Sequence, residues 1–194
     1  MSDLPLPHRH FILHKPFGYL SQFIGNPKNK KLLGHLYDFP VGTMAIGRLD
    51  QDSEGLLLLT TDGKMSEHVR GRKVEKEYYA QVDGIITPEA IAQLQAGGIE
   101  IAHEKQPYFT LPCQARHLNP APEFPERSRR VRDDRHGPTS WVSIILTEGK
   151  NRQVRKMTAA VGFPTLRLIR VRIGEITLGT MASGEVQEAS NLTV

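Results

Sequence analysis

The chain of 194 residues has only one cysteine and no long apolar run. Cys113 alone excludes an internal disulfide and a metal site built from several thiolates. No activating base lies beside Cys113 in the sequence, so interior packing is a simpler interpretation than a role as nucleophile. The longest apolar run, 56–59, is too short to span a bilayer and predicts a strand. Residues 1–10 lack the apolar centre of a secretory signal, so we expect a cytoplasmic protein without membrane contact.

Acidic residues are missing from one part of the chain. The net charge is only +4, but residues 149–172 contain no aspartate or glutamate. A solvated helix face normally mixes both signs of charge, so this one-sided stretch favours contact with RNA or DNA. A basic surface that only improves solubility is the alternative. The cations of this stretch are Lys150, Arg152, Arg155, Lys156, Arg167, Arg170 and Arg172.

The pattern of apolar and turn residues predicts a mixture of helices and strands. Thr87 and Pro88 are typical of a helix start, with threonine as the N-cap and proline at the first helical position. Several neighbouring strands have connections too short for parallel crossovers, so we expect a single α+β domain over 1–194, with a mainly antiparallel central sheet flanked by helices. The expected strands are 10–14, 56–59, 77–83, 99–102, 109–115, 141–147 and 166–172, and the expected helices are 32–37, 87–96, 151–161 and a short one with Met65 and Val69.

Residues 116–140 differ from the rest because prolines and arginines are concentrated there. We interpret this stretch as a mobile, basic surface insertion in which Asp133 and Asp134 offset part of the charge. It contains Pro120, Pro122, Pro125 and Pro138, together with Arg127, Arg129, Arg130, Arg132 and Arg135.

Three carboxylates, those of Asp50, Asp52 and Glu54, lie in the loop 47–55 directly before the apolar run. Such a loop can expose reactive side chains while the following strand fixes their position. A metal site is one interpretation, although the stretch lacks the ligand and glycine pattern of a calcium loop. A structural turn that holds Arg48 is another. In the third, one ionised carboxylate acts as nucleophile or base beside an arginine that keeps it charged.

Four segments resemble, in the same order, the motifs of the RsuA-type RNA pseudouridine synthases. Residues 47–63, with Gly-Arg-Leu-Asp at 47–50 and Ser-Glu-Gly-Leu at 53–56, are similar to the signature around the aspartate of that family. Residues 15–18 resemble its first motif, 76–78 its tyrosine motif and 148–157 its third motif. The resemblance covers about residues 11–180, and four ordered motifs are far more specific than any one of them.

The resemblance implies a pseudouridine synthase fold made of two subdomains similar to ferredoxin, at about 9–68 and 69–185. It implies the isomerisation of uridine to pseudouridine in ribosomal RNA, with 23S rRNA of the large subunit as the expected partner. We expect no cofactor and no metal, because the reaction needs neither redox change nor energy input, and we expect a monomer. A non-catalytic factor that binds rRNA or assists ribosome assembly, and an RNA N-glycosidase with a carboxylate pair, are the alternatives.

The resemblance also assigns roles to single residues. Asp50 stands where the family has its catalytic aspartate, Tyr78 matches the tyrosine that packs on the target base, and Arg155 matches the arginine that pairs with the aspartate. Many relatives carry a small RNA-binding domain before the catalytic part, whereas the motifs here begin at residue 15. We therefore expect the catalytic domain itself to bind RNA, through Arg48, Lys15, Lys150, Arg152, Lys156 and Arg170.

Overall fold

The computed structural model describes residues 7–25, 30–71, 73–132 and 134–194. Within these ranges it contains one sheet of nine strands, two small sheets and three α-helices. The helices are α1 (Gly63–Gly71), α2 (Pro88–Ala96) and α3 (Gln153–Ala160). The small sheets pair β2 (Tyr19–Leu20) with β3 (Lys31–Leu32), and β7 (Glu100–His103) with β8 (Gln106–Phe109). The large sheet contains β1 (His10–Lys15), β4 (Met44–Ile46), β5 (Glu54–Thr60), β6 (Lys76–Asp83), β9 (Gln114–Leu118), β10 (Thr139–Leu146), β11 (Thr165–Ile173), β12 (Ile176–Thr177) and β13 (Val186–Ala189).

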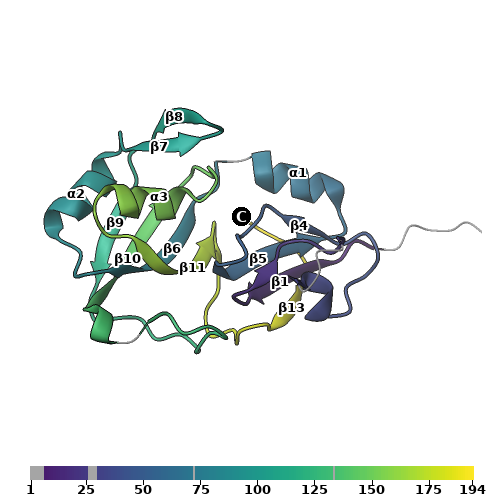
Figure 1. Cartoon of the computed structure of the whole chain (residues 1–194). Helices are drawn as coiled ribbons and strands as arrows, with labels where there is room; N and C mark the ends of the chain where they lie inside the picture. The colour runs from purple at the N-terminus through teal and green to yellow at the C-terminus, as the bar shows by residue number, and fades with distance from the viewer. Residues whose placement is uncertain (1–6, 26–29, 72, 133) are drawn as a thin grey trace, which may run out of the picture.

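The large sheet consists of two antiparallel groups of strands that meet at one parallel pair. Its order is β13-β1-β5-β11-β6-β10-β9, with β4 beside β5 and β12 beside β11. Only β5 and β11 are parallel; the other pairings in this sheet, among the described residues, are antiparallel. Figure 1 shows the two groups side by side, with α1 near β4 and α2 and α3 near β9, β10 and β6. The α+β class and the mainly antiparallel sheet are confirmed, and the division into two subdomains near residue 68 stays a prediction.

Gly55 makes the close approach at this junction possible. It is the Cα partner of Arg170 across the parallel pair, and its φ of +104° lies in a region that other residues rarely adopt. A Cβ at this position would lie 2.3 Å from the carbonyl oxygen of Arg170. A side chain here would therefore push β5 and β11 apart, and with them the two groups of strands.

The apolar run Leu56–Leu59 is buried on both of its faces. Alternation along β5 sends Leu56 and Leu58 into a cluster with Val69 of α1, and sends Leu57 and Leu59 into another with Phe11 of β1. A third cluster fills the space between the strands β6 and β10 and the helices α2 and α3. The first two clusters, which include Leu49 of the preceding loop, hold β5 and the end of that loop against the rest of the sheet.

The short strands β2, β3, β4, β12 and β13 match no predicted strand. Most of the predicted elements lie where the sequence places them, with three differences. The strand expected at 109–115 is two strands, β8 and β9, with Pro112 between them where a proline cannot donate to a ladder. The helix expected at 32–37 is only a 3-10 turn, Leu33–His35. The insertion expected at 116–140 is shorter, because β9 and β10 take its two ends. Asp133, expected to offset its charge, and residues 1–6 lie outside the described residues.

The described part of the segment 119–138 packs against the sheet. The ring of Phe124 lies 5.6 Å from that of Trp141 and 6.1 Å from that of Tyr79, measured between centroids. A nitrogen of Arg132 donates to a carboxylate oxygen of Asp83 at 2.6 Å. These contacts hold the part 119–132 of the segment to the strands β6 and β10, while the mobility of the segment stays a prediction.

The start of α2 confirms the predicted cap. The hydroxyl oxygen of Thr87 accepts a hydrogen bond from the backbone nitrogen of Ala90 at 3.2 Å, and Pro88 begins the helix. All three α-helices are short, at nine residues or fewer. Throughout the part of the chain that the structure describes, no helix is long and apolar enough to cross a membrane.

Candidate active site

A cavity of about 410 Å³ lies where the two groups of strands meet. The loop before β5, the start of β6, the end of β10, the start of α3 and β11 all contribute to its walls. A volume of this size is at the lower end of the range for small-ligand sites and suits one nucleoside. The lining residues on which its chemistry depends are Asp50, Lys76, Tyr78, Glu148, Arg152 and Arg170.

The floor of the cavity is one face of the sheet. Lys76 and Tyr78 are two positions apart on β6, so both side chains project to the same side. Arg170 on β11 is the Cα partner of Tyr78, and cross-strand partners also share a face. The floor therefore combines an aromatic ring with two cations.

Hydrogen bonds on both sides of Asp50 fix its position. On one side, the backbone nitrogen of Leu49 donates to the hydroxyl of Ser21 at 3.0 Å, and that hydroxyl donates to the carbonyl oxygen of Leu49 at 2.8 Å. On the other, the backbone nitrogen of Gly18 donates to the carbonyl oxygen of Gln51 at 2.8 Å. Gly18 of the first motif and Ser21 beyond it thus hold the two chain neighbours of Asp50, whose own side chain is 33% exposed and lines the cavity.

Lys15 stabilises the turn of the first motif from the protein interior. Its side chain is fully buried, and Nζ donates to the carbonyl oxygens of Pro16 at 3.0 Å and Tyr19 at 2.8 Å. Burial lowers the pKa of Lys15 to about 7, although the carboxylates of the 50–54 stretch oppose this shift. The expectation that Lys15 contacts RNA is wrong, because a fully buried ammonium group has no surface to offer.

Arg152 bridges two carboxylates at the rim of the cavity. Nη1 lies 3.4 Å from Oδ2 of Asp50 and 2.8 Å from Oδ1 of Asp52, and Nη2 lies 2.9 Å from Oδ2 of Asp52. The hydrogen bonds from Arg152 hold the pKa of Asp52 below its usual value. Arg152 is the N-cap of α3 and has a φ of 53°, a left-handed conformation that costs a non-glycine residue about 1 kcal/mol.

Arg155 contacts the loop next to Asp50 and not Asp50 itself. Its Nη2 donates to the carbonyl oxygen of Asp52 at 2.8 Å and to the hydroxyl of Ser53 at 3.3 Å. Among the described residues, the ion-pair partner of Asp50 is Arg152, so the expected pairing between Arg155 and Asp50 is wrong. Arg155 is the third residue of α3, and from there its side chain reaches the backbone of Asp52. Arg152, at the N-cap of the same helix, is the residue that reaches Asp50.

No pattern in the sequence indicates the hydrogen-bond network that holds the opposite wall of the cavity. The buried side chain of Gln153 accepts from the backbone nitrogen of Lys150 at 3.1 Å and donates to Glu148 at 2.6 Å. Glu148 also accepts from the hydroxyl of Tyr108, which raises the pKa of that tyrosine, and from the backbone nitrogen of Leu111 at 3.1 Å. Both Glu148 and Gln153 lie inside the third motif, but nothing in their spacing shows that they face each other.

Four of the six expected RNA contacts line the cavity, namely Arg48, Lys150, Arg152 and Arg170. Arg48 and Arg152 are exposed, whereas Arg170 is only 4% exposed. Lys156 does not line the cavity, and its Nζ donates to the carbonyl oxygen of Ala102 on β7 at 2.6 Å. The exposed arginines can contact a nucleic-acid strand that lies over the rim of the cavity. The buried Arg170 can contact a group that enters the cavity.

The three loop carboxylates do not converge on one point. Asp50 and Asp52 share Arg152, while Glu54 is buried and forms an ion pair of 2.8 Å with Arg167. Over the described ranges of the chain, no group of three histidine, cysteine, aspartate or glutamate side chains could hold a metal ion. The metal interpretation of this loop therefore has no geometric support.

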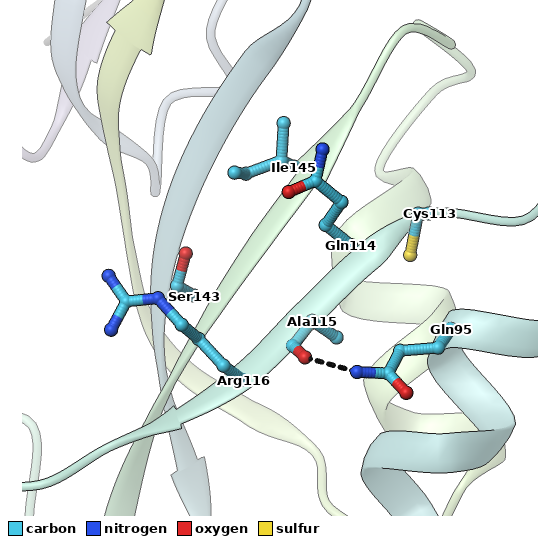
Figure 2. A pocket seen from close by; sticks show the side chains of 7 residues that line it. All are labelled: Gln95, Cys113, Gln114, Ala115, Arg116, Ser143 and Ile145. Carbon is cyan, nitrogen blue, oxygen red and sulfur yellow. Dashed lines mark hydrogen bonds between the residues drawn. The ribbon is translucent and has the colours of Figure 1, made fainter.

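A second cavity, of about 370 Å³, lies at the free edge of β9. Figure 2 shows Gln95 of α2 reaching the carbonyl oxygen of Ala115, a hydrogen bond of 2.7 Å that covers part of this edge. The thiol of Cys113 lies beside it and donates to the carbonyl oxygen of Leu94 at 3.1 Å. Burial raises the pKa of Cys113 to about 11, so the thiol stays protonated at neutral pH and the packing interpretation of this cysteine is favoured.

The first cavity holds the groups needed to act on a nucleotide. The ring of Tyr78 can support a base that has left its stack, and the rim arginines can bind phosphates. The carboxylate of Asp50 can attack the anomeric carbon of a ribose or remove a ribose proton. Together these groups define an enzyme that acts on the bond between base and sugar in a nucleic acid.

Comparisons with known proteins agree with this class. The family model described as RNA pseudouridylate synthase matches residues 9–160. The chain belongs to this family and is an RNA pseudouridine synthase, an enzyme that isomerises uridine in RNA.

Relatives and a solved structure cover most of the chain. Ribosomal large subunit pseudouridine synthase E of Xanthomonas axonopodis pv. citri (strain 306) is 43% identical over 173 residues, which are 88% of this chain and 88% of the relative. The protein with the same description from Vibrio parahaemolyticus serotype O3:K6 is 41% identical over 180 residues, 91% of this chain and 72% of the relative. A structure described as a crystal structure of pseudouridylate synthase has a TM-score of 0.74 and 26% identity, and the match covers 95% of this chain and 71% of that one. The pseudouridine synthase fold is thereby confirmed.

Proposed function

We propose that this pseudouridine synthase modifies a uridine of 23S rRNA, in the large ribosomal subunit. Both relatives described above, which are 43% and 41% identical over most of the chain, are described as ribosomal large subunit pseudouridine synthases. The observation that carries the proposal is the position of Asp50, which lines a nucleoside-sized cavity beside Tyr78 and is held on both sides by hydrogen bonds.

In the proposed reaction Asp50 acts as the ionised catalytic carboxylate. The target uridine leaves its stack, at a cost of a few kcal/mol, and its base lies on the ring of Tyr78. Arg152 keeps negative charge at Asp50 favourable by direct contact, and Arg155 is a positioning residue that holds the backbone of the loop. Arg48, Lys150, Arg152 and Lys156 bind the phosphates on either side, which offsets the cost of extruding the base.

The enzyme is further proposed to work as a monomer in the cytoplasm, where ribosomal RNA is available. Light scattering after size exclusion, with and without an rRNA fragment, should give the mass of a single chain. A stable dimer would contradict this part of the proposal.

The substitution Asp50→Asn tests the catalytic role. We expect it to keep rRNA affinity within about twofold and to lower pseudouridine formation by at least about 10³-fold, because the geometry remains while the reactive charge is lost. Affinity is measured by filter binding and product by nucleoside analysis of digested rRNA. Asp38→Asn is a matched control, because Asp38 is exposed and does not line the cavity, and it should keep full activity.

Four outcomes would contradict the proposal. Pseudouridine formed by Asp50→Asn would remove Asp50 from the catalytic role. Free uracil released by the wild type, in place of an isomerised nucleotide, would indicate an N-glycosidase. Binding of rRNA without any chemical change would indicate a non-catalytic factor. Mapping of pseudouridines in rRNA from cells that lack the protein identifies the target, and an unchanged 23S rRNA would contradict the proposed substrate.

A further inference from the structure

Two buried or half-buried cations on the floor of the cavity have hydrogen-bond donors to spare. Nε of Arg170 donates to the carbonyl oxygen of Leu56 at 2.8 Å, but Nη2, although shielded from solvent, has no partner among the described residues. Nζ of Lys76 donates to the carbonyl oxygen of Val74 at 3.0 Å, and an ammonium group has three protons to give. Buried donors without an acceptor are rare in native proteins, so the floor is arranged for an acceptor that arrives with the substrate.

Neither cation of this floor forms an ion pair with a carboxylate among the described residues, and Asp50, which lines the same cavity, pairs with Arg152. Burial lowers the pKa of Lys76, and the positive charge of Arg170 lowers it further, which shows that the two cations are close enough to repel each other. Glu148 lines the same cavity, but its oxygens already accept from Tyr108, Leu111 and Gln153. Such a pair of cations favours an anion, or an oxygen that becomes negative during the reaction.

We propose that Lys76 and Arg170 form a subsite for the carbonyl oxygens of the target uracil, and that they stabilise the anion which this base becomes when its bond to ribose breaks. This inference rests on the proposed function, since it assigns a new role within the same cavity. Lys76 is the central residue, because it projects from β6 two positions from Tyr78, on the same face as the ring that supports the base.

The isomerisation requires such a subsite for a chemical reason. When the bond between C1′ and N1 breaks, its electron pair stays on the uracil ring and is shared by N1, O2 and O4. The base then turns, C5 bonds to C1′, C5 loses its proton and N1 gains one, so the product is an isomer of the substrate. Whether Asp50 attacks C1′ or removes a ribose proton, the base departs with the pair, and donors at its oxygens lower the barrier.

Phosphate is a poorer occupant of this subsite than uracil. Arg170 is only 4% exposed, and a phosphate would have to be stripped of water to reach it. The phosphates of an extruded nucleotide stay on the strand outside, where the exposed Arg48 and Arg152 lie at the rim. The floor and the rim thus meet different parts of one nucleotide.

The test compares Lys76→Met on two substrates, 23S rRNA transcripts made with uridine or with 5-fluorouridine. Fluorine makes uracil a more stable anion, so its departure depends less on the protein. We expect Lys76→Met to slow single-turnover cleavage of the C1′–N1 bond about 100-fold with uridine and about tenfold or less with 5-fluorouridine. RNA affinity should stay within about twofold, and Lys76→Arg should recover most of the rate on uridine.

Lys64→Met is the matched control, because Lys64 is exposed on α1 and does not line the cavity; it should behave as the wild type on both substrates. An equal loss of rate on the two RNAs would overturn the subsite, since a merely structural role does not depend on the leaving group. A different result would be weaker RNA binding, with the slope of log affinity against log salt reduced by about one phosphate contact. That result would show that Lys76 binds the phosphate backbone of the RNA and would overturn the subsite. A wild type that cleaves neither RNA would overturn the proposed function, and the subsite with it.

Discussion

The contacts of Arg152 allow its effect on stability to be separated from its effect on catalysis. Its ion pair with Asp52 is about 40% exposed on both sides, and pairs of this kind add about 1 kcal/mol or less to stability. The same side chain touches Asp50 inside the site. We therefore predict that Arg152→Gln lowers kcat at least about tenfold while the Tm changes by only about 2–4 °C. Kinetics on rRNA and thermal unfolding followed by circular dichroism measure the two effects.

Arg9→Gln is the control for this prediction. Arg9 donates through two nitrogens to Glu188 at 2.6 and 2.7 Å, and the two side chains are about as exposed as those of Arg152 and Asp52. This pair lies on β13 and the chain before β1, away from the cavity. Arg9→Gln should therefore shift the Tm slightly and leave kcat unchanged. A kcat for Arg152→Gln equal to that of Arg9→Gln would contradict the role of Arg152.

Lys15 should make the stability of the enzyme depend on pH. Its pKa is about 7 in the folded protein, whereas the ordinary pKa of an exposed lysine is 10.5. Between these values the unfolded chain binds more protons at Lys15 than the folded one, so stability rises with pH above about 7. The predicted contribution has a slope of at most about 1.4 kcal/mol per pH unit. Urea unfolding between about pH 7 and pH 8.5 measures it, below the range in which the raised pKa of Cys113 acts in the opposite direction.

Lys15→Met should remove this slope, whatever its effect on absolute stability. The exposed Lys64 again provides the control, because Lys64→Met should keep the wild-type slope. If the wild type and Lys15→Met have parallel pH profiles, the lysine is charged in the folded state throughout this range. The variant should also lower kcat, because Lys15 holds the turn that holds the neighbours of Asp50.

At the level of elements, the contact of β5 with β11 is possible only because Gly55 has no side chain. Gly55→Ala would place a methyl group 2.3 Å from the carbonyl oxygen of Arg170, at a φ of +104°. We predict a loss of about 3–5 kcal/mol in the free energy of unfolding, because both strain and separation of the strands are involved. Gly63→Ala at the start of α1 is the control, since a Cβ there meets nothing within 4 Å. A Gly55→Ala protein as stable as Gly63→Ala would contradict the account of the junction.

The sequence predicted elements better than contacts. The run Leu56–Leu59 and the cap at Thr87 are local patterns, and the structure confirms both. The assignment of Arg155 as the partner of Asp50, made from the resemblance, is wrong because the position of the neighbouring Arg152 depends on one backbone angle. Arg152 stands in a left-handed conformation at the helix start, so helical spacing does not describe the direction of its side chain.

Burial explains the other errors at this scale. Nothing in a single sequence shows that Lys15 ends beneath the turn that follows it, because its burial comes from strands distant in the chain. Lys76 was predicted only as part of the tyrosine motif, and its partnership with Arg170 follows from the pairing of β6 with β11. The burial of Lys15 and the position of Lys76 near Arg170 arise from tertiary contacts, so they can be seen only in the folded structure.

At the scale of the whole molecule, the segment 119–138 connects the two groups of strands. Phe124 packs on Tyr79 and Trp141 of one group, and the carbonyl oxygen of Pro125 accepts from Arg167 at 2.8 Å. Arg167 in turn holds Glu54, where β5 of the other group begins. Contacts that cross the junction in this way favour a single cooperative unit.

We therefore predict one unfolding transition in urea, with the fluorescence of Trp141, the only tryptophan, and far-ultraviolet circular dichroism changing together. Phe124→Ala should cost about 2–3 kcal/mol, since the lost ring is half-buried between two others, and should keep the transition single. Phe109→Ala is the control, because Phe109 is 60% exposed on β8 and should cost far less. Two separate transitions would instead mean that the strand groups fold independently and that the segment 119–138 does not couple them.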